Sequence, residues 1–167
     1  AVTLAYTFYL YFDFAGYSEM ARASALLLGL DIPENFKTPF FATNFSGFWN
    51  RWHITLSTWF RDFVFMRFTR WVMHRKLLRD RLQVAMCAFM VDMLVMGFWH
   101  GIAWCYIAYG LYHGVLLAAT QAIQKRWGFY KRHRRDGWFR ACSWAVTQVL
   151  VFLGFAIFSG QVGMLLG

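Results

Sequence analysis

The chain has 167 residues, of which 59% are hydrophobic and 22% aromatic, and it carries 17 Lys+Arg against 8 Asp+Glu. Ordinary globular chains are about 45–50% apolar, so this excess favours a protein that lies in a lipid bilayer. A nucleic-acid-binding protein would also show basic patches, but it would not show long apolar runs beside them. We therefore expect no nucleic acid partner.

The first expected element is an apolar segment at Ala1–Leu30, which is interrupted by charged residues. Because Glu19 and Arg22 are three residues apart, they can pair on one face of a helix. The stretch that follows, "LDIPENFKTPFFATNF", contains both prolines of the chain. Pro33 and Pro39 disfavour helical backbone in the residue before each of them, so this stretch is predicted to be a loop.

The next stretch, "FWNRWHITLSTWFRDF" (Phe48–Phe63), is predicted to form one amphipathic helix. At about 100° per residue, its aromatic and leucine side chains fall within an arc of about 120°, and polar side chains occupy most of the rest. His53 lies at the border between the two faces. The segment is too short and too charged to span a bilayer, so we expect it to lie in the interface or to cap a polar cavity.

Three later runs are each long enough to cross a bilayer of about 30 Å, namely Leu82–Trp99, Ile102–Ile123 and Cys142–Leu166. Dense basic blocks, Arg61–Arg81 and Lys125–Arg140, lie on either side of the first two runs. Positively charged residues collect on the cytoplasmic side of membrane proteins, so both blocks are predicted to face the cytoplasm.

The first two runs meet at "GFWHGIAW" (Gly97–Trp104), which contains the main catalytic candidate, His100. If both runs span fully, this junction lies away from the cytoplasm, but Gly97 and Gly101 allow a bend within the membrane instead. A histidine in such apolar surroundings is costly to bury without a partner. Two interpretations stay open: a structural histidine bonded to a carbonyl at a kink, or a neutral general base that accepts a proton from a hydroxyl.

The other polar residues are weaker candidates. Taken alone, His53 is more typical of an interfacial histidine than of a catalyst, and His113 is expected to pack. His74 and His133 lie in basic runs and are expected to be solvated. Asp92 is about two helical turns before His100, where a packing hydrogen bond is favoured over a polarising role. None of these residues has metal-ligand spacing, so no metal site is predicted.

Four stretches, "YFDFAGYSEMA", "PENFKTPF", "FWNRWHITLSTWFRDFVF" and "MGFWHGIAWCYIAYGLYHG", together resemble the membrane-bound O-acyltransferase (MBOAT) family. The stretches "FMRFTRWVMHRKLL" and "FLGFAIFSG" favour the branch that transfers D-alanine. The resemblance implies an all-α polytopic membrane protein, in which a ring of transmembrane helices surrounds a thin, funnelled core. Interfacial or re-entrant amphipathic helices would complete it. Residues 1–167 would be the C-terminal part of a single domain whose N-terminal part is absent.

The resemblance also implies the site and its partners. His100 takes the position of the family's catalytic histidine, and His53 that of its second polar residue. The residues predicted to bind or orient the substrate are Asn50, Arg51, Trp52 and Trp99. The donor would be a thioester on the phosphopantetheine of an acidic D-alanyl carrier protein in the cytoplasm, and the protein itself would bind no cofactor.

The implied acceptor is teichoic acid or an intermediate acceptor protein, and the implied location is the plasma membrane of a bacterium, among its lipids. The chain would cross this membrane several times. Two rival functions stay open. One is an O-acetyltransferase acting on an exported polysaccharide such as alginate. The other is a non-enzymatic membrane scaffold, in which His100 would only be a kink residue.

Overall fold

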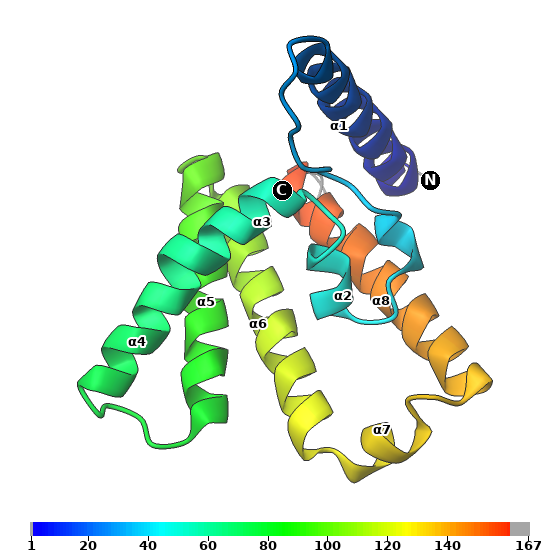
Figure 1. Cartoon of the computed structure of the whole chain (residues 1–167). Helices are drawn as coiled ribbons and strands as arrows, with labels where there is room; N and C mark the ends of the chain where they lie inside the picture. Colours follow the sequence, from blue (N-terminus) through cyan, green and yellow to red (C-terminus); the bar gives the residue numbers. More distant parts are fainter. Residues whose placement is uncertain (1, 161–167) are drawn as a thin grey trace.

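The computed structural model describes residues 2–160, and within this range it contains helices and no β-strand (Figure 1). The expected all-α fold is confirmed. The elements are α1 (Val2–Leu27), the 3₁₀ turn η1 (Pro39–Phe41), α2 (Phe45–Trp49), α3 (Ile54–Phe60), the π-helical turn η2 (Arg61–Phe65), α4 (Met66–His74), α5 (Arg81–His100), α6 (Trp104–Arg126), α7 (Gly128–His133) and α8 (Gly137–Phe158).

In the described part of the chain, α5 and α8 are the helices that are both long enough and apolar enough to cross a membrane. The predicted runs Leu82–Trp99 and Ile102–Ile123 correspond to α5 and α6. Gly97 does not bend α5, which runs to His100 and ends where Gly101 adopts a φ of 151°. The third run, Cys142–Leu166, corresponds to α8, and its residues 161–166 lie outside the described range.

Helices α5 and α6 form a hairpin, while α6 and α8 meet at one end and diverge toward α7 (Figure 1). Two glycines bring the hairpin together closely. A Cβ added at Gly97 would lie 2.5 Å from the carbonyl oxygen of Tyr106, and one added at Gly110 would collide with the carbonyl oxygen of Met93. Small residues of this kind are what membrane helices use to let their backbones approach.

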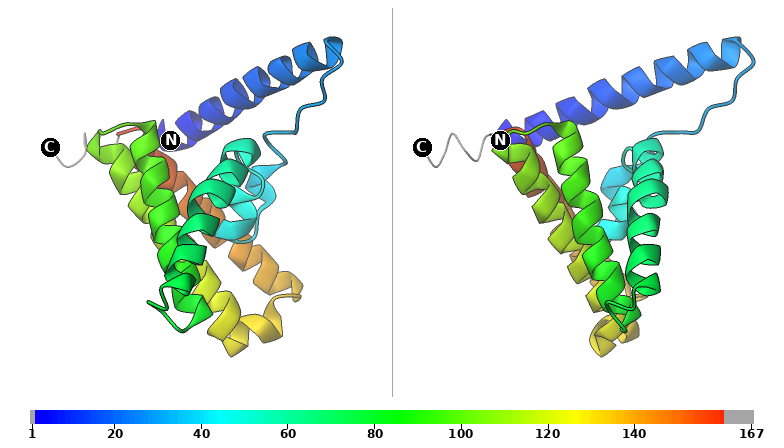
Figure 2. Two further views of the ribbon diagram at one scale, coloured as in Figure 1. Left: turned by 60° about the vertical axis from the view of Figure 1, so that its left-hand side comes forward. Right: turned by 90° about the vertical axis from the view of Figure 1, so that its left-hand side faces the viewer.

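Helix α1 projects away from the other helices (Figure 2). Its position is fixed by aromatic contacts near its middle, where Phe8 and Tyr11 pack on Phe40 at ring-centroid distances of 5.3 and 5.1 Å. The predicted pair of Glu19 and Arg22 is present at 3.6 Å. Thr7 is the one buried residue of α1 within the described structure, so most of this helix is free for lipid or further protein.

The prediction of one continuous helix over Phe48–Phe63 is wrong. Helix α2 ends at Trp49, and α3 begins only at Ile54. The break occurs because His53 adopts a left-handed backbone conformation, with φ 46° and ψ 53°, which no α-helix can include. Beyond the break, α3, η2 and α4 follow one another without interruption (Figure 1).

The break lets α2 enter the core while α3 turns away from it. Trp49 and Trp52 are buried at the centre of an aromatic cluster between α6 and α8. Trp52 packs on Phe48 at 5.6 Å and on Phe155 of α8 at 4.9 Å between ring centroids. Gln148 of α8 also donates a hydrogen bond to the loop before α2. The core therefore lies around α2, where three distant parts of the chain meet.

The Arg75–Arg81 part of the first basic block lies at the same end of the helix pair as the second block. Asp80 caps α5 by accepting a hydrogen bond from the Leu82 amide at 2.9 Å, and its other carboxylate oxygen pairs with Arg126 at the end of α6. The loop from Arg75 to Asp80 and helix α7 both occupy this end (Figure 1). That this end faces the cytoplasm stays a prediction.

Cysteine labelling tests this orientation. We expect single cysteines at Arg79 and Arg134, in full-length protein without its other cysteines, to resist an impermeant maleimide in intact cells. Both should react once the membrane is permeabilised, because both belong to the basic end. Labelling of either position from outside would contradict the orientation.

Candidate functional site

His53 lies in the turn between α2 and α3, and the preceding loop holds its imidazole in place. Its Nδ1 lies 3.0 Å from Asn35 Oδ1. Phe14 of α1 meets the imidazole edge-to-face at 4.6 Å between ring centroids, and Phe36 lies parallel to it at 6.5 Å. The imidazole is thus half-buried, with one nitrogen bonded and an aromatic wall around it.

His100 is the last residue of α5, at the end of the helix that lies away from the basic blocks. Aromatic rings surround it: Phe158 of α8 at 5.1 Å, Tyr106 at 6.1 Å and Tyr109 at 6.3 Å between ring centroids. The side chain is partly exposed. An imidazole in such apolar surroundings is favoured in its neutral form, which is the form a general base needs.

His53 and His100 are far apart in sequence, and in the fold the charge of one still reaches the other. Burial and, second, the positive charge on His100 lower the pKa of His53 to about 4. His53 is therefore neutral at pH 7. His53 packs on Phe14 and Phe36, whereas His100 packs on Tyr106 and Phe158, so the two imidazoles have separate aromatic surroundings. Their catalytic roles stay predictions.

The other predicted site residues are divided between different places. Asn50, the C-cap of α2, lines a cavity beside α3, whereas Arg51 points away from it and donates to Thr38 Oγ1 at 3.4 Å. Trp52 belongs to the buried core. Trp99 is exposed, and its ring lies 4.9 Å from that of His100. Asn50 and Trp99 are thus accessible to a ligand, and the roles predicted for all four residues stay predictions.

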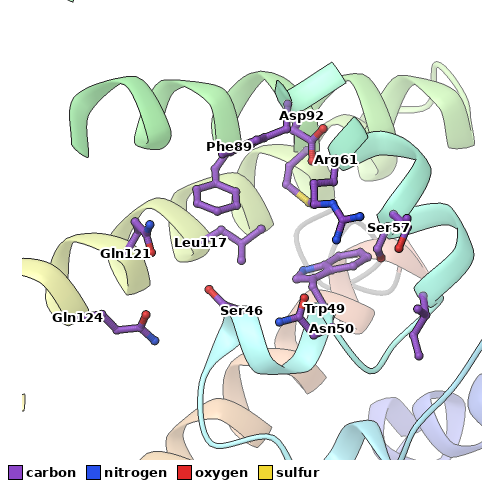
Figure 3. Close-up of a pocket in the computed structure, with 14 residues that line it drawn as sticks. Ser46, Trp49, Asn50, Ser57, Arg61, Phe89, Asp92, Leu117, Gln121 and Gln124 are labelled. Carbon is purple, nitrogen blue, oxygen red and sulfur yellow. The ribbon is translucent and has the colours of Figure 1, made fainter. Parts of the chain in front are cut away.

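A cavity of about 430 Å³ lies between α2, the α3–η2 segment, α5 and α6. Ser57 and Arg61 line one side of it, and Gln121 and Gln124 of α6 line the other (Figure 3). Gln124 is two residues from Arg126 at the basic end, while Ile54 and Asn50 are neighbours of the His53 turn. The cavity therefore extends from near the basic end to the residues beside the His53 turn, and neither His53 nor His100 is among its lining residues.

Asp92 of α5 faces this cavity next to Arg61 (Figure 3). Asp92 is 5% exposed, and its Oδ1 has no hydrogen-bond partner among the described residues. The packing hydrogen bond favoured from sequence comes from the Phe65 backbone to the Asp92 carboxyl group, and it leaves Oδ1 without a partner. A buried carboxylate oxygen at the wall of a polar cavity needs a donor from water or from a ligand.

The three remaining histidines have separate surroundings. His113 of α6 is fully buried, and its Nδ1 accepts a hydrogen bond from Trp49 Nε1 at 3.1 Å. Its opposite nitrogen faces Gly154 of α8. His113 is thus part of the core, as expected. His74 is exposed, and His133 is paired with Asp136 at 2.8 Å.

Sequence reasoning missed Asn35, Gln121 and Gln124. The two glutamines stand three residues apart near the end of an apolar run, which is a detectable signal for a polar wall. Asn35 gives no such signal, because an asparagine in a proline-containing loop is common.

Comparison with known proteins establishes the class of this protein. The sequence model of MBOAT, the membrane-bound O-acyltransferase family, matches residues 1–162. The chain belongs to this family, which is membrane-bound, as the motifs predicted.

Similar proteins include the teichoic acid D-alanyltransferase of Streptococcus thermophilus, 44% identical over 95% of this chain and 40% of that protein. That of Bacillus subtilis is 42% identical over 93% of this chain and 40% of that protein. The probable alginate O-acetylase AlgI of Pseudomonas putida is 37% identical over 95% of this chain and 30% of that protein. The chain thus spans about two fifths, or less, of the length of these relatives.

Proposed function

We propose that this chain is the C-terminal part of a multi-pass acyltransferase in a bacterial plasma membrane. The enzyme moves D-alanine from the phosphopantetheine thioester of an acidic carrier protein toward teichoic acid, or toward an intermediate acceptor protein. The observation that carries the proposal is a pair of half-buried histidines, His53 and His100, each packed on aromatic rings, together with a polar cavity that begins beside the His53 turn and reaches Gln124 near the basic end.

In the proposed reaction, His100 accepts the proton of the acceptor hydroxyl, and the hydroxyl oxygen attacks the thioester carbonyl. A new C–O bond forms and the C–S bond breaks. The departing thiolate then takes the proton from the His100 imidazolium, so the base is restored. His53 and Asn50 orient the donor or stabilise the oxyanion. General-base assistance of this kind typically contributes about 10²–10⁴-fold.

The cavity suits the donor arm. Pantetheine carries amide groups, and the walls offer acceptors and donors from Asp92, Gln121 and Gln124, with apolar surface from Phe89 and Leu117 between them. The basic end next to it would attract an acidic carrier protein and its phosphate, since arginine binds phosphate well and complementary charge raises the association rate.

The identity of the acyl group rests on the comparisons. The D-alanyltransferases share 40–44% identity with this chain, and the probable alginate O-acetylases share 35–40%. D-alanine differs from an acetyl group by its ammonium and methyl groups. An O-acetyltransferase is therefore the alternative. An acetyl donor and a D-alanyl donor can be made to compete in one assay.

A donor competition tests the proposal. The full-length protein is reconstituted in liposomes and given equal amounts of carrier protein loaded with D-alanine or with acetate. We expect D-alanyl transfer to exceed acetyl transfer at least about tenfold, because a site that binds a polar group rejects a substrate lacking it. Carrier protein without phosphopantetheine is the control. Preference for acetate would favour the polysaccharide O-acetyltransferase, and transfer of neither group would favour the scaffold.

A further inference from the structure

Asn35, in the loop between α1 and η1, makes several hydrogen bonds to the His53 turn. No sequence pattern indicates them. Its Oδ1 lies 3.0 Å from His53 Nδ1, 2.9 Å from Thr55 Oγ1 and 3.3 Å from the Thr55 amide nitrogen. Its Nδ2 lies 3.1 Å from Ser18 Oγ on α1. One carboxamide therefore joins α1 to the first turn of α3 through the histidine.

The Thr55 amide fixes which way round this carboxamide lies. A backbone N–H only donates, so the atom facing it is the Asn35 oxygen and not the nitrogen. The Asn35 nitrogen then donates to Ser18 Oγ, which accepts. Because the Asn35 oxygen has no proton to give, the bond to His53 exists only when His53 Nδ1 carries the proton.

We propose that Asn35 is a positioning residue for His53. By accepting from Nδ1–H it keeps the neutral imidazole in one tautomer, with the lone pair on Nε2. The proposal rests on the proposed function in one respect, the use of His53 in acyl transfer. The second nitrogen of a histidine is often set in this way by a hydrogen bond to the first, and loss of an orienting partner of a metal-bound histidine costs about 10–100-fold in activity.

The backbone around Asn35 supports the same role. The Ile54 amide donates to the Asn35 carbonyl oxygen, and the Lys37 amide donates to the Arg51 carbonyl oxygen, both at 2.9 Å. These two bonds hold both sides of the residue whose backbone is left-handed, His53. A histidine in this conformation is strained, and it persists only where the surrounding structure enforces it. Here the 35–37 segment enforces it.

Among the neighbours described for His53, Asn35 is the one hydrogen-bonded to the imidazole, so its substitution tests this bond directly. Phe14 of α1 and Phe36 of the loop face the imidazole, and neither ionises. The titratable group that acts on His53 from a packed element is His100 of α5. A carboxylate introduced at position 35 would add an opposite charge directly on Nδ1–H.

The test is Asn35→Asp in the full-length protein. Aspartate keeps the acceptor for His53 and Thr55, and Ser18 can turn its hydroxyl to donate, so the fold is retained. Reaction of His53 with diethyl pyrocarbonate, followed by mass spectrometry across pH, measures the fraction of neutral imidazole. We expect the midpoint to rise by about one pH unit or more, because a nearby opposite charge favours the imidazolium. The pH profile of D-alanyl transfer should move in the same direction.

The matched control is Asn44→Asp. Asn44 caps α2 by accepting from the Gly47 amide at 2.8 Å, a role that aspartate fills equally well. The His53 midpoint should stay unchanged in this variant. A second variant, Asn35→Ala, removes the acceptor and should lower transfer about 10–100-fold while carrier binding is kept.

The outcomes separate the two claims. An unmoved His53 midpoint in Asn35→Asp would overturn the positioning role. Full transfer in Asn35→Ala together with a moved midpoint in Asn35→Asp would leave the positioning role standing and remove His53 from the proposed mechanism. A moved midpoint together with an unmoved pH profile of transfer would support the positioning of His53 by Asn35, and it would remove His53 from the proposed mechanism.

Discussion

Replacement of His100 by glutamine is expected to lower D-alanyl transfer at least about a hundredfold, while the protein still inserts in the membrane and binds the charged carrier. Glutamine has a similar volume and keeps one donor and one acceptor, so a structural role survives the change with little loss of folding. A general base does not survive it, because an amide cannot accept a proton at neutral pH. The measurements are membrane level, carrier binding and transfer in the full-length protein.

The matched control is His74→Gln on the exposed part of α4, which should leave transfer unchanged. The His53→Gln variant should lose less transfer activity than the His100→Gln variant if His53 orients the donor. Near-normal transfer by His100→Gln would contradict the mechanism and would favour the scaffold over the enzyme.

The second large effect is expected at Gly110, where α6 lies closest to α5. Glycine to alanine inside a helix usually stabilises by about 1 kcal/mol, because alanine loses less conformational freedom. At Gly110 the sign should reverse. The new Cβ would collide with the Met93 carbonyl oxygen and lie 3.3 Å from the Gly97 Cα. These are backbone atoms that cannot rotate away, so we expect a loss of about 1–3 kcal/mol and a lower midpoint of thermal unfolding.

Gly128→Ala is the matched control. Gly128 begins α7, and a Cβ there would meet no atom within 4 Å, so its midpoint should not fall. Equal midpoints for Gly110→Ala and the unchanged protein would mean that the two helices are not packed as closely as described here.

Much of the fold was predictable because it depends on local patterns. The long apolar runs located α5 and α6 to within about three residues and α8 with a start five residues too late, and the basic blocks placed the α4–α5 loop and α7 at one end. Hydrophobic length and charge are properties of consecutive residues, so a sequence reveals them directly.

The break at His53 was not predictable from the same patterns. A helical wheel assumes regular backbone, and the Phe48–Phe63 stretch satisfies the wheel even though the chain turns within it. The turn is stabilised by Asn35, which lies 18 residues earlier in the sequence. Contacts between distant residues decide such conformations, and periodicity does not contain them.

The candidate site was predictable in its histidines but not in its walls. His53 and His100 were both proposed from their sequence surroundings and the family motifs, and the structure half-buries both of them against aromatic rings. Trp52, expected at the substrate, lies in the core because the break directs α2 between α6 and α8, and its predicted role stays a prediction. The wheel alone cannot tell an aromatic residue that packs from one that binds.

The π-helical turn η2 has a consequence for the α3–α4 rod as a whole. Such a turn contains one residue more than the α-helix it interrupts. Phe60 and Val72 are 72 − 60 = 12 residues apart, which in an unbroken α-helix would point them about 120° apart. If the extra residue of η2 is left out of the count, the difference in direction falls to about 20°.

Both side chains are buried. The extra residue of η2 therefore brings the buried faces of α3 and α4 onto the same side, so both helices pack against their neighbours along one line. Deleting a single residue from 61–65 would rotate α4 by about 100° relative to α3. The arginines of α4 would then point in a different direction relative to α3, which begins directly after His53. The length of η2 thus sets the angle between the arginines of α4 and the His53 turn.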